Sequence, residues 1–168
     1  MEKYYSTRNT NDRVSFSTGV TRGLSPDGGL YVPESFTNID IYDEKYLKMS
    51  YQELAVDILS NFLDGYTKEE VTTFVSEAYG DNFETKDIVP VKTCDKVNFL
   101  ELFRGPTLAF KDMALQILPK FMVAAARKEG ITDEIVVLTA TSGDTGKAAL
   151  EGFANKEGIK IVVFFPTD

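Results

Sequence analysis

The sequence has no histidine and a single cysteine, Cys94. The absence of histidine removes the commonest general base and metal ligand, together with every catalytic triad built on imidazole. One cysteine excludes an internal disulfide and a centre held by several thiolates, and we expect Cys94 to be a buried apolar side chain. We therefore expect no metal site, since neither histidine nor several thiolates are available as ligands, and we expect any chemistry to rest on other side chains.

Basic side chains are in the minority, since 18 Lys and Arg against 26 Asp and Glu give a formal net charge of −8. Such a surface repels nucleic acid and anionic lipid, so we expect neither as a partner. No apolar run reaches transmembrane length, and the N-terminal MEKYYSTRN lacks the apolar core of a signal peptide. These features favour a cytoplasmic protein, and they leave open a locally basic pocket for an anionic small molecule.

Apolar material is plentiful, with 43% hydrophobic residues that include 12 Phe and 8 Tyr. This is enough for a packed core. In the N-terminal half, Pro26-Asp27-Gly28-Gly29 is a strong turn signal. Two capping boxes, SYQE at 50–53 and TKEE at 67–70, predict two helices that end at Gly65 and Gly80.

The C-terminal half has the pattern of an α/β fold. Residues 97–103 predict a strand and 107–128 a helix, which Pro119 must kink or divide in two. The apolar runs 135–140 and 159–165, with a helix between them, predict a parallel βαβ unit whose strands are covered on both faces. No covering helix follows the last strand, so we expect the chain to be the N-terminal piece of a longer protein.

A loop rich in hydroxyls and glycine, TATSGDTGKAA at 139–149, joins the first of these strands to the next helix. Amides at a helix start are unpaired and carry partial positive charge, so the loop predicts a site for carboxylate or phosphate. Neither the Walker nor the dinucleotide-binding pattern fits it. The alternative is an ordinary capping loop, in which one of three side chains caps the helix: Ser142, Asp144 or Thr145.

A second segment, LFRGPTLAFKDMALQ at 102–116, places Lys111 among apolar residues near the expected helix start. A buried apolar setting disfavours the ammonium form and frees the amine as a nucleophile or base, which covalent catalysis by lysine requires. The alternative is a solvated lysine paired with Asp112, although adjacent side chains on a helix do not face each other.

Four segments in order resemble threonine synthases, pyridoxal-phosphate (PLP) enzymes of the tryptophan-synthase-β-like fold, also called fold type II. They are YYSTRN, GLSPDGGLYVPE, FRGPTLAFKDMALQ and TATSGDTGKAA, and together they span most of the chain. The resemblance implies that residues 1–88 are the family's N-terminal segment with a helical hairpin. Residues 89–168 would then be the first part of its PLP-binding α/β domain.

The resemblance also implies roles for particular residues. Lys111 would form the covalent bond to PLP, beside Phe110, and Asp144 would lie near the 3′ oxygen of the cofactor. Other cofactor contacts are implied for Ser142, Gly143 and Thr145, and substrate contacts for Thr141, Ser142, Thr145 and Arg104. Arg104 stands where family members often have histidine, so a proton-transfer role is not expected there, whereas attraction of an anion is.

The implied reaction converts O-phosphohomoserine and water to threonine and phosphate, with Lys111 moving protons at the α and β carbons of the substrate. Because the remaining cofactor contacts would lie beyond residue 168, we expect the segment alone to be inactive. Two alternatives stay open: a non-catalytic module of threonine synthase type, and a lyase similar to threonine dehydratases. The N-terminal YYSTRN and PDGGLYVPE segments argue against the dehydratase.

Overall fold

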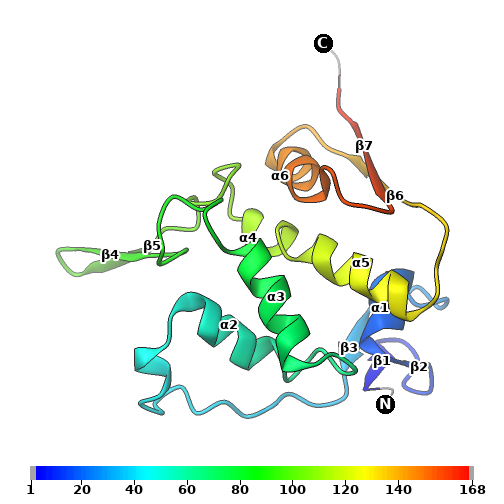
Figure 1. The fold of residues 1–168 in the computed structure, drawn as a ribbon, viewed down its shortest axis with the longest axis horizontal. Helices are drawn as coiled ribbons and strands as arrows, with labels where there is room; N and C mark the ends of the chain where they lie inside the picture. The colour runs from blue at the N-terminus through cyan, green and yellow to red at the C-terminus, as the bar shows by residue number, and fades with distance from the viewer. Residues whose placement is uncertain (1–2, 167–168) are drawn as a thin grey trace. The chain divides into compact units, whose positions relative to one another are not determined.

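The computed structural model describes residues 3–166, which form two compact units (Figure 1). The first unit contains the chain up to residue 75 together with 124–131, and the second contains 76–123 and the chain from 132 onward. Helices α3 (Lys68–Ala78) and α5 (Leu118–Lys128) each contribute to both units. The expected domain boundary at residue 88 lies within the second unit and stays a prediction.

The first unit begins with a three-stranded antiparallel sheet in the order β2-β1-β3. Its elements are β1 (Tyr4–Ser6), β2 (Arg13–Val14), α1 (Phe16–Arg22) and β3 (Tyr31–Pro33). The predicted turn before β3 is confirmed: one carboxylate oxygen of Asp27 accepts the Gly29 N–H at 2.8 Å, and the Ser6 hydroxyl donates to the same oxygen at 2.8 Å. These bonds tie the turn to β1.

Both predicted capping boxes form in the first unit. Glu53 accepts the Ser50 N–H at 2.8 Å before α2 (Tyr51–Leu59), and Glu70 accepts the Thr67 N–H at 2.7 Å before α3. A short 3-10 helix, η1 (Tyr46–Lys48), precedes α2. The first predicted helix ends earlier than expected, at Leu59, and turns occupy the residues up to Gly65.

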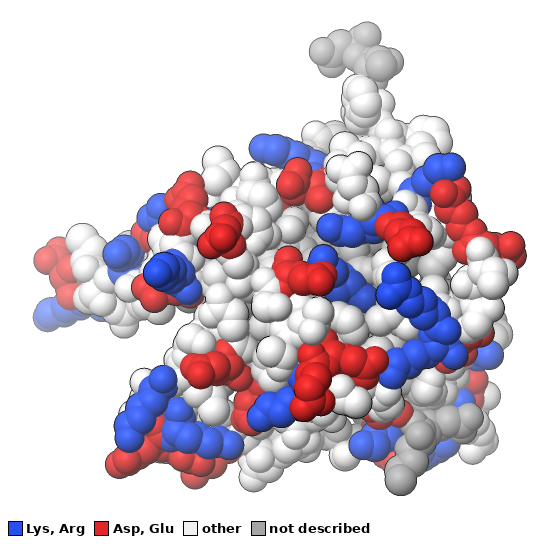
Figure 2. Space-filling view, viewed as in Figure 1, with Lys and Arg blue, Asp and Glu red and all other residues white. Residues whose placement is uncertain are grey.

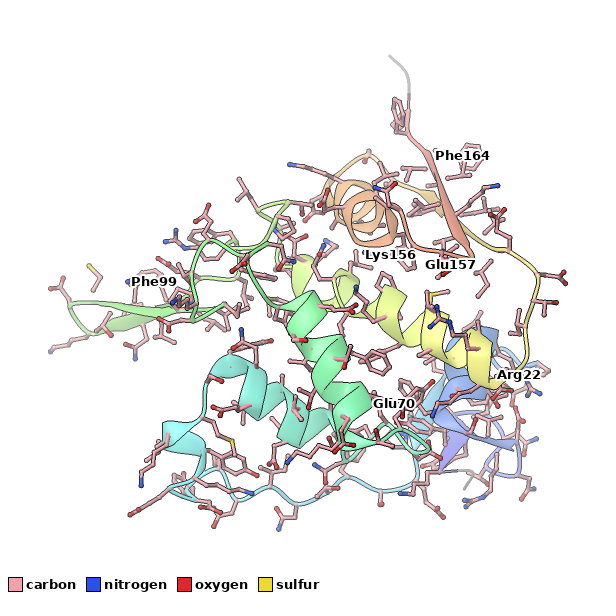
Figure 3. All side chains as sticks on the ribbon, in the orientation of Figure 1. Arg22, Glu70, Phe99, Lys156, Glu157 and Phe164 are labelled. Atoms are coloured by element: carbon pink, nitrogen blue, oxygen red, sulfur yellow. The ribbon has the colours of Figure 1, made fainter. Side chains whose placement is uncertain are left out.

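The second unit contains an antiparallel hairpin of β4 (Val91–Cys94) and β5 (Val97–Leu100). The sequence predicted one strand here, extending to residue 103, and missed β4 because Lys92 and Thr93 interrupt its apolar pattern. All eight strand residues are exposed, including Phe99 (Figure 3). The expectation of a buried Cys94 is therefore wrong, because this hairpin has no described element packed over it.

The helix expected over 107–128 is two helices, α4 (Asp112–Leu115) and α5. Pro119 lies in the first turn of α5, where its missing N–H removes no helical hydrogen bond, so the chain divides instead of kinking. Residues 107–111 precede α4 as a loop. Leu108 has a φ of 62°, outside the helical region, which explains why the helix begins five residues later than predicted.

The predicted parallel βαβ unit is confirmed as β6 (Ile135–Ala140), α6 (Asp144–Phe153) and β7 (Ile159–Phe164), with Ile135 opposite Ile159. Helix α6 covers one face of the two strands. A core forms there from Ala149, Phe153 and Ile159 with Leu115, Leu118, Met122, Val123, Ile135, Val137 and Ile161.

The other face of β6 and β7 is exposed at four apolar positions: Val136, Leu138, Val162 and Phe164. Figure 3 shows Phe164 on the side of β7 away from α6. The expectation of burial on both faces does not hold for the described residues, since a single layer of helices lies against the sheet. Along both strands, burial accordingly alternates with the period of the pleat.

On the face drawn in Figure 2, acidic and basic side chains are interspersed. Ion pairs between described residues include Lys120 with Glu77 and Lys160 with Glu134. Between residues 3 and 166, no helix is long and apolar enough to cross a membrane.

Gly152 fixes the approach of α6 to α4. A Cβ atom at this position would lie 2.0 Å from the Leu115 carbonyl oxygen, so Gly152→Ala must push the two helices apart. We expect a loss of about 1–3 kcal/mol of stability, the usual range for overpacking, measured by urea unfolding.

The matched control for this prediction is Gly19→Ala in α1. There a Cβ would meet its nearest neighbour, Tyr31, at an ordinary 3.6 Å. Removing a glycine from a helix with space to spare should leave stability unchanged or increase it by up to about 1 kcal/mol. Equal losses in the two variants would contradict the assigned role of Gly152.

Candidate active site

Lys111 lies at the start of α4, as the residue that precedes the helix. Its amine is 3.0 Å from Oδ1 of Asp144 and 4.3 Å from the centre of the Phe110 ring. The Lys111 side chain is 27% exposed, and Phe110 and Leu108 are more than half exposed. The expectation of an enclosed apolar setting is therefore wrong, because the large apolar side chains that precede Lys111 in this loop are exposed.

Asp144 is the first residue of α6. Its contact with Lys111 joins the motif TATSGDTGKAA to the segment LFRGPTLAFKDMALQ. Gly143 precedes the helix with no side-chain cap, so the interpretation of the loop as an ordinary capping loop is not supported. The Gly143 N–H donates to the Thr141 hydroxyl at 3.2 Å, and a Cβ on Gly143 would meet no atom within 4 Å. The start of α6 thus presents uncapped amides beside open space.

The remaining residues of the loop lie at this helix start as well. Ser142 is exposed and Thr145 is half-buried at the beginning of α6. Thr141 donates its backbone N–H to the Phe164 carbonyl at 2.9 Å, which ties the loop to β7. Loop 141–145 and Lys111 are therefore joined through Asp144, and the sequence predicted all of these residues.

Asp112 does not pair with Lys111 as the alternative interpretation required. Its carboxylate is fully buried, and it accepts the Thr107 backbone N–H at 2.8 Å and the Thr107 hydroxyl at 2.6 Å. Sequence reasoning noted Asp112 only as the neighbour of Lys111. The bond to a hydroxyl five residues earlier follows no helix or turn spacing that could have revealed it.

Arg104 makes three hydrogen bonds to acidic side chains. Its Nε and Nη2 donate to Glu101 at 2.9 and 2.6 Å, and its Nη1 donates to Glu84 at 2.7 Å. Bonds to Glu84 and Glu101 raise the pKa of the Arg104 guanidinium further above its usual value. With one guanidinium and two carboxylates the cluster carries a net charge of −1, and a role of Arg104 in substrate binding stays a prediction.

Lys147 was not singled out from the sequence, although it lies within the motif TATSGDTGKAA. Its amine is 3.4 Å from the backbone carbonyl oxygen of Thr107. It is a second amine beside the segment that carries Lys111, and it can compete with Lys111 for an aldehyde.

Comparison with known proteins bears on the same segments. Residues 3–79 match the family described as threonine synthase N terminus. Over 98% of its length the chain is 37% identical to the threonine synthase of Methylobacillus glycogenes, of which it covers 36%. Over 97% it is 35% identical to that of Schizosaccharomyces pombe, of which it covers 34%.

Solved structures agree. The crystal structure of PLP-bound threonine synthase from Brucella melitensis matches 99% of this chain at 36% identity, with a TM-score of 0.89. Yeast threonine synthase matches 98% of it at 31% identity, also with a TM-score of 0.89. The chain is a homologue of the N-terminal part of threonine synthases. It spans about a third of their length, 36% and 35% of these two structures.

The resemblance and the α/β fold class predicted from the sequence are thus confirmed, and the roles of individual residues stay predictions. The arrangement fits PLP chemically. A partly exposed primary amine is available to the aldehyde, and an uncapped helix start with open space beside Gly143 is available to an anionic group.

The two carboxylates on Arg104 differ in exposure, since the Glu101 side chain is 15% exposed and that of Glu84 is 51% exposed. We therefore expect Glu101→Gln to lower the midpoint of urea unfolding more than Glu84→Gln, because exposed ion pairs contribute little. Both variants keep side-chain size and can be compared directly. A larger effect of Glu84→Gln would show that Glu101 is not the main partner of Arg104.

Proposed function

We propose that this chain supplies the cofactor-binding lysine and the substrate-facing loop of a threonine synthase, which converts O-phosphohomoserine and water to threonine and phosphate with PLP. The observation that carries the proposal is the 3.0 Å contact between Lys111 and Asp144. It joins the two segments that resemble the family's catalytic motifs, in a chain homologous to threonine synthases.

Lys111 would hold PLP through its aldehyde group, and its amine, once released, would move protons at the α and β carbons of the substrate. PLP supplies the electron sink that makes those carbons acidic. Since the sequence has no histidine, Lys111 is the most suitable proton carrier that these segments offer. Phe110 lies against the amine, and Asp144 orients it from the start of α6.

The uncapped start of α6 is the proposed site for substrate anions. Its backbone amides carry partial positive charge, and Gly143 lets a ligand approach them closely. The hydroxyls of Thr141, Ser142 and Thr145 are the donors available beside them. Arg104 uses three of its five N–H groups on Glu101 and Glu84. Direct binding of the substrate by Arg104 therefore requires that the guanidinium leave one of these carboxylates, of which the more exposed Glu84 is the easier to displace.

The whole reaction belongs to the proposal for a protein of the relatives' length, because this chain spans about a third of them. We propose that the chain alone binds PLP without forming threonine. The match of residues 3–79 to the threonine synthase N terminus favours a synthase over a dehydratase.

The first test concerns the lysine. We expect the chain mixed with PLP to develop the visible absorption of a lysine–PLP adduct, and borohydride to fix the cofactor on the Lys111 peptide. Lys111→Arg keeps the positive charge but should abolish the visible band, since a guanidinium does not condense with the aldehyde. Lys147→Arg, the matched control, should leave the band intact. Trapping on Lys147 or on many lysines would refute the assignment.

The second test concerns the reaction. We expect a chimera, in which this chain replaces the matching first third of yeast threonine synthase, to release phosphate from O-phosphohomoserine and form threonine. The same chimera carrying Lys111→Ala should release none. Ammonia release from threonine without threonine formation would favour the dehydratase. A soluble chimera that binds no PLP at Lys111 would favour a non-catalytic module.

A further inference from the structure

We propose that Asp112 is a positioning residue, whose buried carboxylate holds the loop of residues 105–111 and thereby sets the place of the Lys111 amine. The proposal rests on the function proposed above for Lys111. It assigns a role to Asp112 and Thr107 that the resemblance of the motifs does not supply.

The first observation is the burial of a carboxylate whose bonds are local. Asp112 is 0% exposed, and both of its oxygens accept hydrogen bonds from the same residue, Thr107. A buried carboxylate is costly unless it is well bonded. Bonds that span five residues do not join distant parts of a core. What they fix is the loop between Thr107 and Asp112, and Lys111 lies in that loop.

The second observation is how closely the backbone approaches this carboxylate. A Cβ on Gly105 would lie 2.6 Å from Oδ2 of Asp112, so the chain presses against the carboxylate before reaching Thr107. Gly105 and Thr107 are both buried. The carboxylate therefore fills the space that the loop encloses and leaves little freedom for its movement.

The third observation is a strained backbone conformation at Leu108, which neighbouring interactions must stabilise. Leu108 has a φ of 62°, which is unfavourable for a residue with a branched side chain. Its own side chain is 60% exposed, so packing of that side chain does not hold the conformation. The Leu108 N–H donates to the Gly105 carbonyl at 3.1 Å, and the bonds from Thr107 to Asp112, on either side of Leu108, are the side-chain interactions that hold the loop in this shape.

The fourth observation links this loop to Asp144. The Thr107 carbonyl oxygen faces the Lys147 amine of α6 at 3.4 Å, one turn after Asp144. Thr107 thus donates its N–H and hydroxyl to Asp112, next to Lys111, and its carbonyl accepts from Lys147 on the helix that carries Asp144. Loss of the bonds to Asp112 would let Lys111 move relative to Asp144, although both helices remain packed through Gly152.

Three variants separate positioning from folding. Asp112→Asn keeps the shape but removes the charge, so the charge-assisted bonds become neutral ones in which the NH2 group can only donate to the Thr107 hydroxyl. Thr107→Val removes the hydroxyl and keeps the volume, whereas Thr107→Ser keeps both bonds. Ile159→Val trims the core of the same unit without touching the loop, and it serves as the control for a general loss of stability.

The readout is the dissociation constant of the Lys111–PLP adduct, measured by visible absorption and assigned by borohydride trapping and peptide mapping. We expect Asp112→Asn and Thr107→Val to weaken the adduct by roughly tenfold, as loss of a charge-assisted hydrogen bond predicts. Thr107→Ser and Ile159→Val should remain near the wild type. An unchanged adduct in folded Asp112→Asn, or equal weakening in Ile159→Val, would overturn the proposal.

A second readout does not require PLP. Competitive labelling with acetic anhydride, followed by mass spectrometry, gives the reactivity of Lys111 in each variant relative to Lys45, which pairs with Asp57 in the first unit. We expect this ratio to change in Asp112→Asn and Thr107→Val and to be preserved in Thr107→Ser. If the wild type forms no adduct, the proposed function fails, and the labelling ratio still decides the positioning role. If Asp112→Asn does not fold, the difference in labelling ratio between Thr107→Val and Thr107→Ser decides the positioning role.

Discussion

The pair of hydrogen bonds between Thr107 and the buried carboxylate of Asp112 is the interaction on which the candidate site depends. It makes residues 105–111 a closed loop instead of the first turns of a helix. The helix that follows is consequently short, and Lys111 is the residue that precedes its first turn, so it does not lie on a buried helix face. The amine is reachable from solvent for this reason, whereas a helix beginning at residue 107 would have carried Lys111 in its second turn.

The parallel βαβ unit positions the other half of the site, Asp144 and the loop before it, through the usual geometry of a strand followed by a helix. A strand that ends at Ala140 and a helix that begins at Asp144 leave a short loop at the carboxyl end of the sheet, where ligands of α/β proteins commonly bind. Gly152 then lets α6 lie against the backbone of Leu115. Packing that serves the core in this way also brings Asp144 to Lys111.

Prediction from the sequence succeeded where the determining contacts are local. The capping boxes at Ser50 and Thr67 and the parallel strands follow short-range rules of spacing and burial, and the structure confirms them. It failed where a contact outside those rules decides the outcome. The apolar run around Lys111 predicts a buried helix, but the Thr107–Asp112 bonds and the positive φ of Leu108 override that preference.

The same distinction applies to the exposed surfaces. The apolar runs of β6 and β7 indicate that these residues pack in a sheet, but they do not reveal how many layers cover that sheet. Cys94 is a similar case, since its usual burial is a statistical tendency that an unpacked hairpin does not follow. Among the site residues, the motifs gave Lys111 and Asp144, and the pairing between them required the fold.

The Lys111–Asp144 ion pair must be compatible with covalent binding of an aldehyde, because attack by the amine requires that it leave the carboxylate. The exposures of the two side chains, 27% and 51%, decide this point. A pair with that much access to water contributes about 0–1 kcal/mol, so its rupture is a small barrier beside the energy of a new covalent bond. A fully buried pair would have locked the amine in place. The half-exposed pair instead orients Lys111 toward the start of α6 and still lets it react, which links the surface position of the loop directly to its proposed chemistry.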